Sequence, residues 1–138
     1  MKKYEMLTRM VRVIGHKKLY RIKALKSFGD VQKGDLGGWI EKEANLSHQD
    51  DAWVFDDAWI YDDACISENA IVYGKARICG KARVSDYACI SGNVSVYGNA
   101  SVSGNAKISG CAVIYDNVKI GGCTRITGQA RISAKGMQ

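Results

Sequence analysis

The sequence has no proline, only two histidines and few aromatic residues, which make up 9% of its 138 residues. Without proline, tight turns depend on residues that tolerate positive φ, chiefly the 15 glycines. No apolar run is long enough to span a membrane, and Met1-Lys2-Lys3 leads into mixed polar residues rather than into the apolar segment of a signal peptide. We therefore expect one turn-rich, cytoplasmic domain without membrane contact.

Residue types that carry catalysis or bind metals are also scarce. Two histidines cannot supply a three-histidine zinc site, and both His16 and His48 precede the regular part of the chain. We interpret His16 as a turn residue and His48 as a partly buried capping residue. The five cysteines indicate reduced thiols, because their spacing fits neither a zinc module nor a disulfide framework. We predict no catalytic, metal-binding or cofactor-binding residue, and no enzyme activity.

The regular part of the chain is a six-residue repeat that runs from Ala52 to Ser133. A small residue, mostly alanine, stands at every sixth position, and Val or Ile follows two residues later at all 14 positions. Two residues further on, glycine or an acidic residue occupies 13 of the 14 positions, from Asp56 to Gly128. A period that never slips is typical of a solenoid, in which each repeat stacks on its neighbours.

This period also predicts the shape of the solenoid. Three six-residue units close one triangular coil, with Val or Ile pointing inward on each side and the small residue near a corner. Gly-Asn pairs such as Gly98-Asn99 suit the corners because both residues tolerate positive φ. We predict an all-β fold, a left-handed parallel β-helix of about 4.6 coils over residues 52–133.

Residues 1–51 do not follow the repeat and are expected to form a capping segment. Two runs of alternating residues flank a Gly-His-Lys-Lys turn at positions 15–18, which predicts a β-hairpin. The adjacent Gly37 and Gly38 indicate tight backbone turning, and we expect Trp39 to plug the first coil. Residues 134–138 are expected to be a short C-terminal tail.

The repeat resembles the hexapeptide repeat of left-handed β-helices, although its glycine stands one position later than in the commonest enzyme version. The whole chain resembles a group of small proteins often found in phage and prophage genomes, through residues 19–25, Gly34-Asp35-Leu36-Gly37-Gly38-Trp39-Ile40 with its continuation to Ser47, and Ala52-Trp53-Val54. The resemblance implies this fold, a bacterial host cell, and a phage setting in which some small β-helix proteins block bacterial defence machinery.

Stacking the repeat by eighteen residues divides the outward side chains among three faces. One face carries the aromatic residues Trp59, Tyr61, Tyr97 and Tyr115. Tyrosine and tryptophan near arginine have the composition of a protein interface, so these four residues are candidates for partner binding. The alternative is cross-strand packing that stabilises neighbouring coils. We call residues 1–51 the leader, and we expect its hairpin to cover Trp53 and Phe55 on a second face.

Charge is distributed in three blocks. The net charge is +7 over residues 1–36, −8 over residues 37–69 and +7 over residues 70–138. The acidic block supplies four further candidates for partner binding, Asp56, Asp57, Asp62 and Asp63. They are expected either to form ion pairs between coils, Asp57 with Lys75 and Asp63 with Lys81, or to attract a basic partner by mimicking nucleic-acid phosphate. A Ca²⁺ site is a third alternative.

The C-terminal coil has only residues 134–138 to cover it. We expect its inward residues Ile120, Ile126 and Ile132 to be exposed and to form a homodimer interface. The other candidate for this interface is the tyrosine column, which consists of Tyr61, Tyr97 and Tyr115. The function predicted is a non-catalytic protein-binding module, and more specifically an anti-CRISPR-like inhibitor that contacts a defence-complex subunit of the bacterial host. The alternatives are an acyltransferase-like enzyme, a structural or polymer-forming phage protein, and direct nucleic-acid binding through the basic ends.

Overall fold

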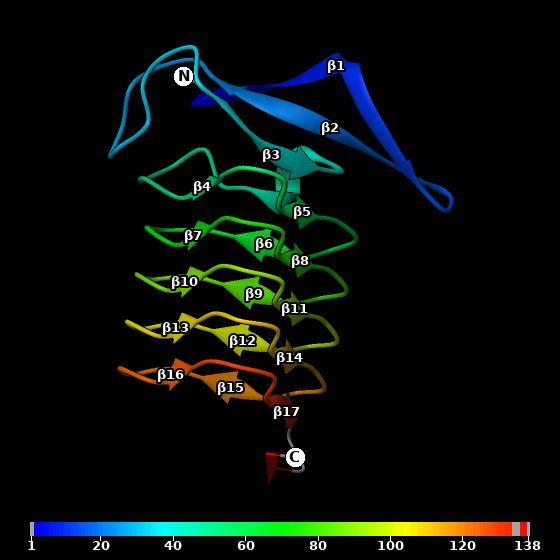
Figure 1. Cartoon of the computed structure of the whole chain (residues 1–138). Helices are drawn as coiled ribbons and strands as arrows, with labels where there is room; N and C mark the ends of the chain where they lie inside the picture. Colours follow the sequence, from blue (N-terminus) through cyan, green and yellow to red (C-terminus); the bar gives the residue numbers. More distant parts are fainter. Residues whose placement is uncertain (1, 134–135, 138) are drawn as a thin grey trace.

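The computed structural model describes residues 2–133 and 136–137 and consists of stacked triangular coils beneath an N-terminal hairpin (Figure 1). Within the described residues, fourteen short strands form the sides of the coils. They are β4 (Trp53–Val54), β5 (Trp59–Ile60), β6 (Cys65–Ile66), β7 (Ile71–Val72), β8 (Arg77–Ile78), β9 (Arg83–Val84), β10 (Cys89–Ile90), β11 (Ser95–Val96), β12 (Ser101–Val102), β13 (Lys107–Ile108), β14 (Val113–Ile114), β15 (Lys119–Ile120), β16 (Arg125–Ile126) and β17 (Arg131–Ser133).

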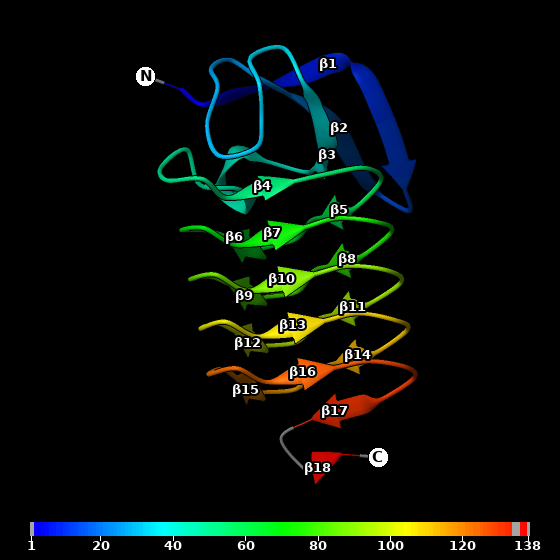
Figure 2. The ribbon, with the colours of Figure 1, turned by 60° about the vertical axis from the view of Figure 1, so that its left-hand side comes forward.

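The coils stack in the predicted register. Each strand from β4 to β14 pairs in parallel with the strand eighteen residues later, as Trp59 with Arg77 and Ser95 with Val113. Three sheets result: a nine-stranded sheet that we call the long sheet, which is parallel from β3 to β17 and antiparallel at both ends, and two parallel sheets of five and four strands. The chain descends as a left-handed β-helix, which confirms the predicted fold (Figure 2).

The core is narrow because the repeat supplies only one medium-sized and one small side chain per side. Inward Val and Ile residues such as Val72 and Ile90 are fully buried, and so are the alanines that precede them near the corners. A stack of β-branched side chains suits a strand, and these inward residues form the core of the prism. The apolar period therefore accounts for both the strands and their packing.

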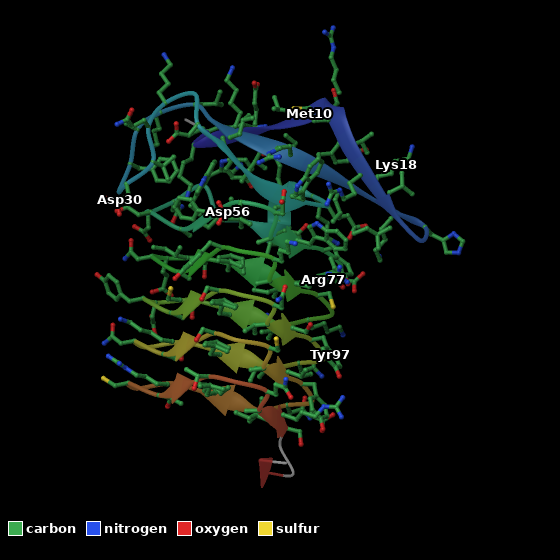
Figure 3. The ribbon with its side chains drawn as sticks, viewed as in Figure 1. Met10, Lys18, Asp30, Asp56, Arg77 and Tyr97 are labelled. Carbon is green, nitrogen blue, oxygen red and sulfur yellow. The ribbon has the colours of Figure 1, made fainter. Side chains whose placement is uncertain are left out.

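The leader forms the predicted hairpin and joins it to the long sheet. Strands β1 (Tyr4–Ile14) and β2 (Lys17–Ala24) pair antiparallel around a turn at Gly15 and His16. Strand β2 pairs antiparallel with β3 (Leu36–Ile40), and β3 pairs in parallel with β5. The register of β1 shifts between Leu7 and Val11, and the strand bends near Met10 (Figure 3). The hairpin thus continues the long sheet and extends sideways past the coils.

Parallel stacking begins at β3, within the segment expected to be the leader. Ile40 lies above Ile60, and Leu46, which follows the 3₁₀ turn η1 (Glu43–Asn45), bridges to Ile66. Gly37 and Gly38 lie within strand β3, so the prediction that they turn the backbone tightly is wrong. A Cβ at Gly38 would lie 2.6 Å from Val54 Cγ1. The glycine pair instead lets β3 pack directly on the first coil.

Trp39 does not plug the first coil, which corrects the prediction made for it. Its side chain lies in the outward column of the long sheet, next to Trp59 in register. The alternation of β3 explains this, because Ile40 points into the prism and its neighbour must point out. Trp53 is covered by the leader as predicted, since the rings of Phe28 and Tyr4 lie 5.2 and 6.1 Å from it.

A polar network fastens the N-terminus to the first coil. The Lys3 ammonium is fully buried and donates to the carbonyl oxygen of Ala52 at 2.6 Å. The Tyr4 hydroxyl donates to Leu46 at 2.6 Å, and the Tyr4 ring stacks on His48. His48 Nδ1 accepts from the Lys3 amide, so Nε2 carries the proton and donates to Glu43. His48 is the partly buried capping residue that was predicted.

The C-terminal coil is better covered than expected. Ile120 and Ile126 are buried and Ile132 is half-buried, so the prediction that all three are exposed is wrong for the first two. Strand β17 pairs antiparallel with β18 (Gly136–Met137), within the expected tail, and residues 134, 135 and 138 lie outside the described residues. In the part of the chain that the structure describes, β15 and β16 each pair with one strand only.

Candidate interaction surface

The four aromatic candidates lie on the outer side of the long sheet, as predicted. Trp59 belongs to a column that starts at Trp39 and continues through Arg77, Ser95 and Val113. Tyr61, Tyr97 and Tyr115 follow their strands by one residue and form the next column, with Cys79 between the first two. From Trp59 and Tyr61 onward, every member of a column is eighteen residues from the next, so the period alone brings these side chains together; Trp39 joins its column from the leader, twenty residues before Trp59.

Tyr97 and Tyr115 stack on each other, with ring centroids 5.6 Å apart and an interplanar angle of 14°. Cross-strand aromatic packing, the alternative interpretation, is therefore present at this pair. Tyr97 nevertheless keeps 39% of its surface exposed. The pair fixes its rings by mutual contact and still presents an aromatic surface to the solvent.

Tyr61 has different surroundings from the other two tyrosines. Burial, together with a hydrogen bond to Cys79, raises the pKa of Tyr61 to about 12. Burial likewise raises the pKa of the Cys79 thiol, which makes it a weak nucleophile. All five cysteines are free thiols, as predicted. Tyr61 is thus a packing residue more than a contact residue, and the exposed part of the column lies at Tyr97 and Tyr115.

Arginine side chains cover the two tryptophans of this face. The Arg77 guanidinium lies 4.1 Å from the centre of the Trp59 ring, and that of Arg12 lies 5.6 Å from it. Arg12 also lies 4.8 Å from the Trp39 ring. Arg12 comes from the hairpin strand β1, so the leader contributes to this surface. A guanidinium stacked on an indole is held by electrostatic attraction and loses little further freedom on binding.

Two adjoining hollows lie beside these arginines, and we call them together the Arg77 groove. The first, of about 280 Å³, is lined by Arg12, Asp57, Trp59, Lys75 and Arg77. The second, of about 290 Å³, shares Lys75 and Arg77 and adds Asn93 and Ser95. Figure 3 shows Arg77 and Tyr97 on the side of the prism over which the hairpin extends.

Two of the four acidic candidates, Asp62 and Asp63, form ion pairs with lysines of the leader. The Lys17 ammonium lies 2.7 Å from Asp62, and that of Lys42 lies 2.8 Å from Asp63. Among the described residues, neither Asp57 with Lys75 nor Asp63 with Lys81 forms an ion pair within 4.0 Å, so the predicted pairs are wrong. The repeat stacks the backbones of neighbouring coils, but Lys42 of the non-periodic leader pairs with Asp63 in place of Lys81.

These ion pairs shift the pKa values of the groups involved. The hydrogen bond to Asp62 raises the pKa of Lys17, and the hydrogen bond from Lys42 lowers the pKa of Asp63. Burial acts to raise the pKa of Asp62, but the hydrogen bonds from Lys17 and the Gly80 amide outweigh it and the pKa is lowered. Both carboxylates are therefore ionised at neutral pH and partly neutralised by the chain's own lysines.

Asp56 and Asp62 lie at corners, and each makes a hydrogen bond to the next coil that was not predicted. Both adopt positive φ at a corner, 57° and 59°, where most coils have glycine. Each carboxylate accepts a hydrogen bond at 3.1 Å from the corner amide of the next coil, that of Gly74 or Gly80. The signal was present in the sequence, because acidic residues replace glycine at this one position of the repeat.

Residues suited to catalysis or metal binding are not gathered on this surface. Within residues 2–133 and 136–137, no group of three or more His, Cys, Asp and Glu side chains is placed to hold a metal ion. His16 is exposed at the hairpin turn, and His48 is engaged in the N-terminal network. No helix of the described chain is long and apolar enough to cross a membrane.

Comparison with known proteins adds no family to this description. No protein-family model matches the chain, and no curated protein matches it at a significant level. What the chain does must therefore be inferred from its surfaces, of which the outer side of the long sheet combines aromatic side chains, stacked arginines and a groove.

Proposed function

We propose that the protein is a non-catalytic protein-binding module that contacts its partner through the outer side of the long sheet. The observation that carries this proposal is the half-exposed Tyr97–Tyr115 stack beside the arginines on Trp59. Tyrosine, tryptophan and arginine dominate the energetics of protein interfaces. Their side chains are already fixed here by stacking on a rigid sheet, so little conformational entropy is lost on binding.

The four acidic candidates support a partner contact less directly. Asp62 and Asp63 are paired with lysines of the leader, and Asp56 and Asp62 hold corner amides. Reversing their charge would disturb the coils as well as any interface. We therefore place the main contact on the aromatic face.

The resemblance to phage and prophage proteins supports a more specific proposal for the partner. We propose that it is a subunit of a bacterial defence complex and that the module inhibits this complex by occupying one of its surfaces. A prism of coils joined by backbone hydrogen bonds suits steric blocking, because a preformed surface needs no conformational change to bind.

Two tyrosines of equal exposure provide a matched test. Tyr73 and Tyr97 are both 39% exposed, but Tyr73 follows β7 in the five-stranded sheet. Tagged wild-type protein, a Tyr97→Ala/Tyr115→Ala double variant and a Tyr73→Ala variant are cross-linked in bacterial lysate, and the captured proteins are quantified. We expect the wild type and the Tyr73 variant to capture the same specific set of proteins. The double variant should capture at least about tenfold less of these proteins.

The same variants test the inhibitor proposal in cells. The wild type and the Tyr73 variant, expressed in bacteria with an active defence system, are expected to raise phage plating efficiency at least about tenfold, and the double variant is not. Equal capture by all three proteins, with unchanged circular dichroism spectra, would show that the aromatic face is not the contact surface.

A further inference from the structure

We infer that the Arg77 groove is a binding site for carboxylates, and that its occupant is an acidic segment of a protein partner. This inference rests on the proposed function, because it assigns the chemistry of the partner at the surface described above. It adds a charged contact from the groove to the aromatic contact from the tyrosine column.

The first argument is the uncompensated charge of the groove. Arg12, Lys75 and Arg77 line it together with a single carboxylate, that of Asp57. None of the three cations forms an ion pair within 4.0 Å with any residue that the structure describes. Lys17, by contrast, lies 2.7 Å from the Asp62 carboxylate. Cations left together without a partner repel one another, and an anion from outside relieves this repulsion.

The second argument is the rigidity of the donors. Arg77 and Arg12 both stack on the Trp59 ring, which holds them at the mouth of the first hollow. A planar guanidinium fixed in this way can donate two parallel hydrogen bonds to one carboxylate. The neutral side chains of Asn93 and Ser95 line the second hollow and can donate further hydrogen bonds. These groups suit a short segment with adjacent carboxylates.

The third argument favours a protein over a nucleic acid as the source of the anion. In the column that carries Arg77, the next two residues, Ser95 and Val113, are uncharged. The next cation of the column is Arg131. A nucleic-acid backbone needs a longer basic track, and Asp57 in the wall would repel its phosphates. Val113 and the Tyr97–Tyr115 stack offer instead an apolar contact next to the groove, which suits a folded partner.

The probe for this site is a hexa-aspartate peptide, titrated into ¹⁵N-labelled full-length protein at low ionic strength. Trp59 Nε1 is buried without a hydrogen-bond partner, so its resonance reports on changes beneath the arginines. We expect saturable shifts of this signal and of the Nε–H signals of Arg12 and Arg77. Arg77→Gln and Arg12→Gln are each expected to weaken binding at least about tenfold, since each removes a charge-assisted hydrogen bond.

Arg83→Gln is the matched control. Arg83 is exposed on β9 at the same position of the repeat, but Glu68 and Asp63 line the surface beside it. We expect the control variant to bind the peptide like the wild type. Equal weakening by Arg83→Gln would show that the peptide responds only to net charge and would overturn the inference. Unchanged binding by the Arg77 variant, or no saturable binding at all, would do the same.

A thymidine hexanucleotide and inorganic phosphate form the second arm of the experiment. Binding of the hexanucleotide at the groove as tight as that of the peptide, or tighter, would identify the anion as phosphate and overturn the carboxylate assignment. The two proposals also fail separately. If the peptide does not bind but the tyrosine double variant still loses its captured proteins, the groove assignment is wrong while the aromatic interface stands.

Discussion

At the scale of single residues, the corner aspartates combine an unfavourable backbone conformation with a compensating hydrogen bond. Asp56 adopts a φ of 57° and accepts a hydrogen bond from the Gly74 amide in the next coil. Asp86 does the same toward Gly104, at 2.9 Å. Positive φ costs an L-residue about 1–2 kcal/mol, and a hydrogen bond returns a similar amount.

Two substitutions at Asp56 separate these effects. Asp56→Ala keeps the unfavourable φ and loses the acceptor, so we expect the free energy of unfolding to fall by about 1–2 kcal/mol. Asp56→Gly removes the acceptor and the strained φ together, so we expect the free energy of unfolding to change by less than about 0.5 kcal/mol. Urea unfolding measures both. Equal losses for the two variants would contradict this account of the corner.

The buried Lys3 ammonium should make stability depend on pH in a defined direction. Burial lowers the pKa of Lys3 from 10.5 to about 8, despite the opposing charges of Asp51 and Asp50. Between these two pH values the unfolded chain binds more protons than the folded chain, so stability rises with pH. Lys3→Met lacks this group, and the stability of the wild type relative to the variant should therefore increase from about pH 7 to pH 9.5.

The range stops below pH 10 because Tyr4 begins to lose its proton in the unfolded chain near its ordinary pKa of 10.0. Burial raises the pKa of Tyr4 in the folded protein, so above that pH this group makes stability fall as the pH rises. Urea unfolding at several pH values measures the difference between wild type and variant. Lys107→Met, at an exposed position in β13, serves as the control for the loss of one surface charge and is expected to show no such trend. A difference for Lys3→Met that stays constant with pH would mean that the ammonium is not desolvated in the folded protein.

At the scale of elements, β3 joins the hairpin to the coils, and its glycine pair allows the join. A Cβ at Gly38 would lie 2.6 Å from Val54 Cγ1 and 2.7 Å from the Ala58 carbonyl oxygen. We expect Gly38→Ala to lower the free energy of unfolding by about 2–3 kcal/mol, because β3 must move away from the first coil. Gly121→Ala is the control, since its Cβ meets nothing closer than Ser103 Oγ at 3.4 Å and a change within about 0.5 kcal/mol is expected. Thermal and urea unfolding compare the two.

The elements differ in how far the sequence determines them. The eighteen-residue register of β4–β17 follows from the period, because a slip by one residue would expose every inward Val and Ile. The columns of Trp59 and of Tyr97 follow from the same register. The placement of the hairpin does not follow from the repeat, because no position of the repeat specifies the contact between Arg12 and Trp59. The same holds for the ion pairs from the leader: Lys42 takes the place of Lys81 at Asp63, and Lys17 pairs with Asp62, for which no partner was predicted.

At the scale of the whole molecule, the two ends of the prism differ in protection. The hairpin and the N-terminal network cover the first coil, whereas the last coil carries a hollow of about 490 Å³ lined by apolar residues that include Ile120, Ile126 and Ile132. Strands β15 and β16 present unpaired edges toward this end within the described residues. Apolar side chains next to unpaired strand edges favour association.

We therefore predict a homodimer formed through the last coil. Light scattering at micromolar concentration should give twice the chain mass, and Thr127→Lys, at an exposed position lining this hollow, should shift the mass toward the monomer. Ser109→Lys, one coil earlier in the same column, is the control and should leave the dimer unchanged. A monomer mass for the wild type at these concentrations would contradict the prediction.

The hairpin and β18 lie at opposite ends of one long sheet whose strands run across the axis of the prism (Figure 1). A pulling force applied between the two ends therefore loads the hydrogen bonds between neighbouring coils a few at a time, instead of loading all of them together. The prism should resist bending and compression as a stiff spacer but yield to tension, and its length should be released in steps of one eighteen-residue coil.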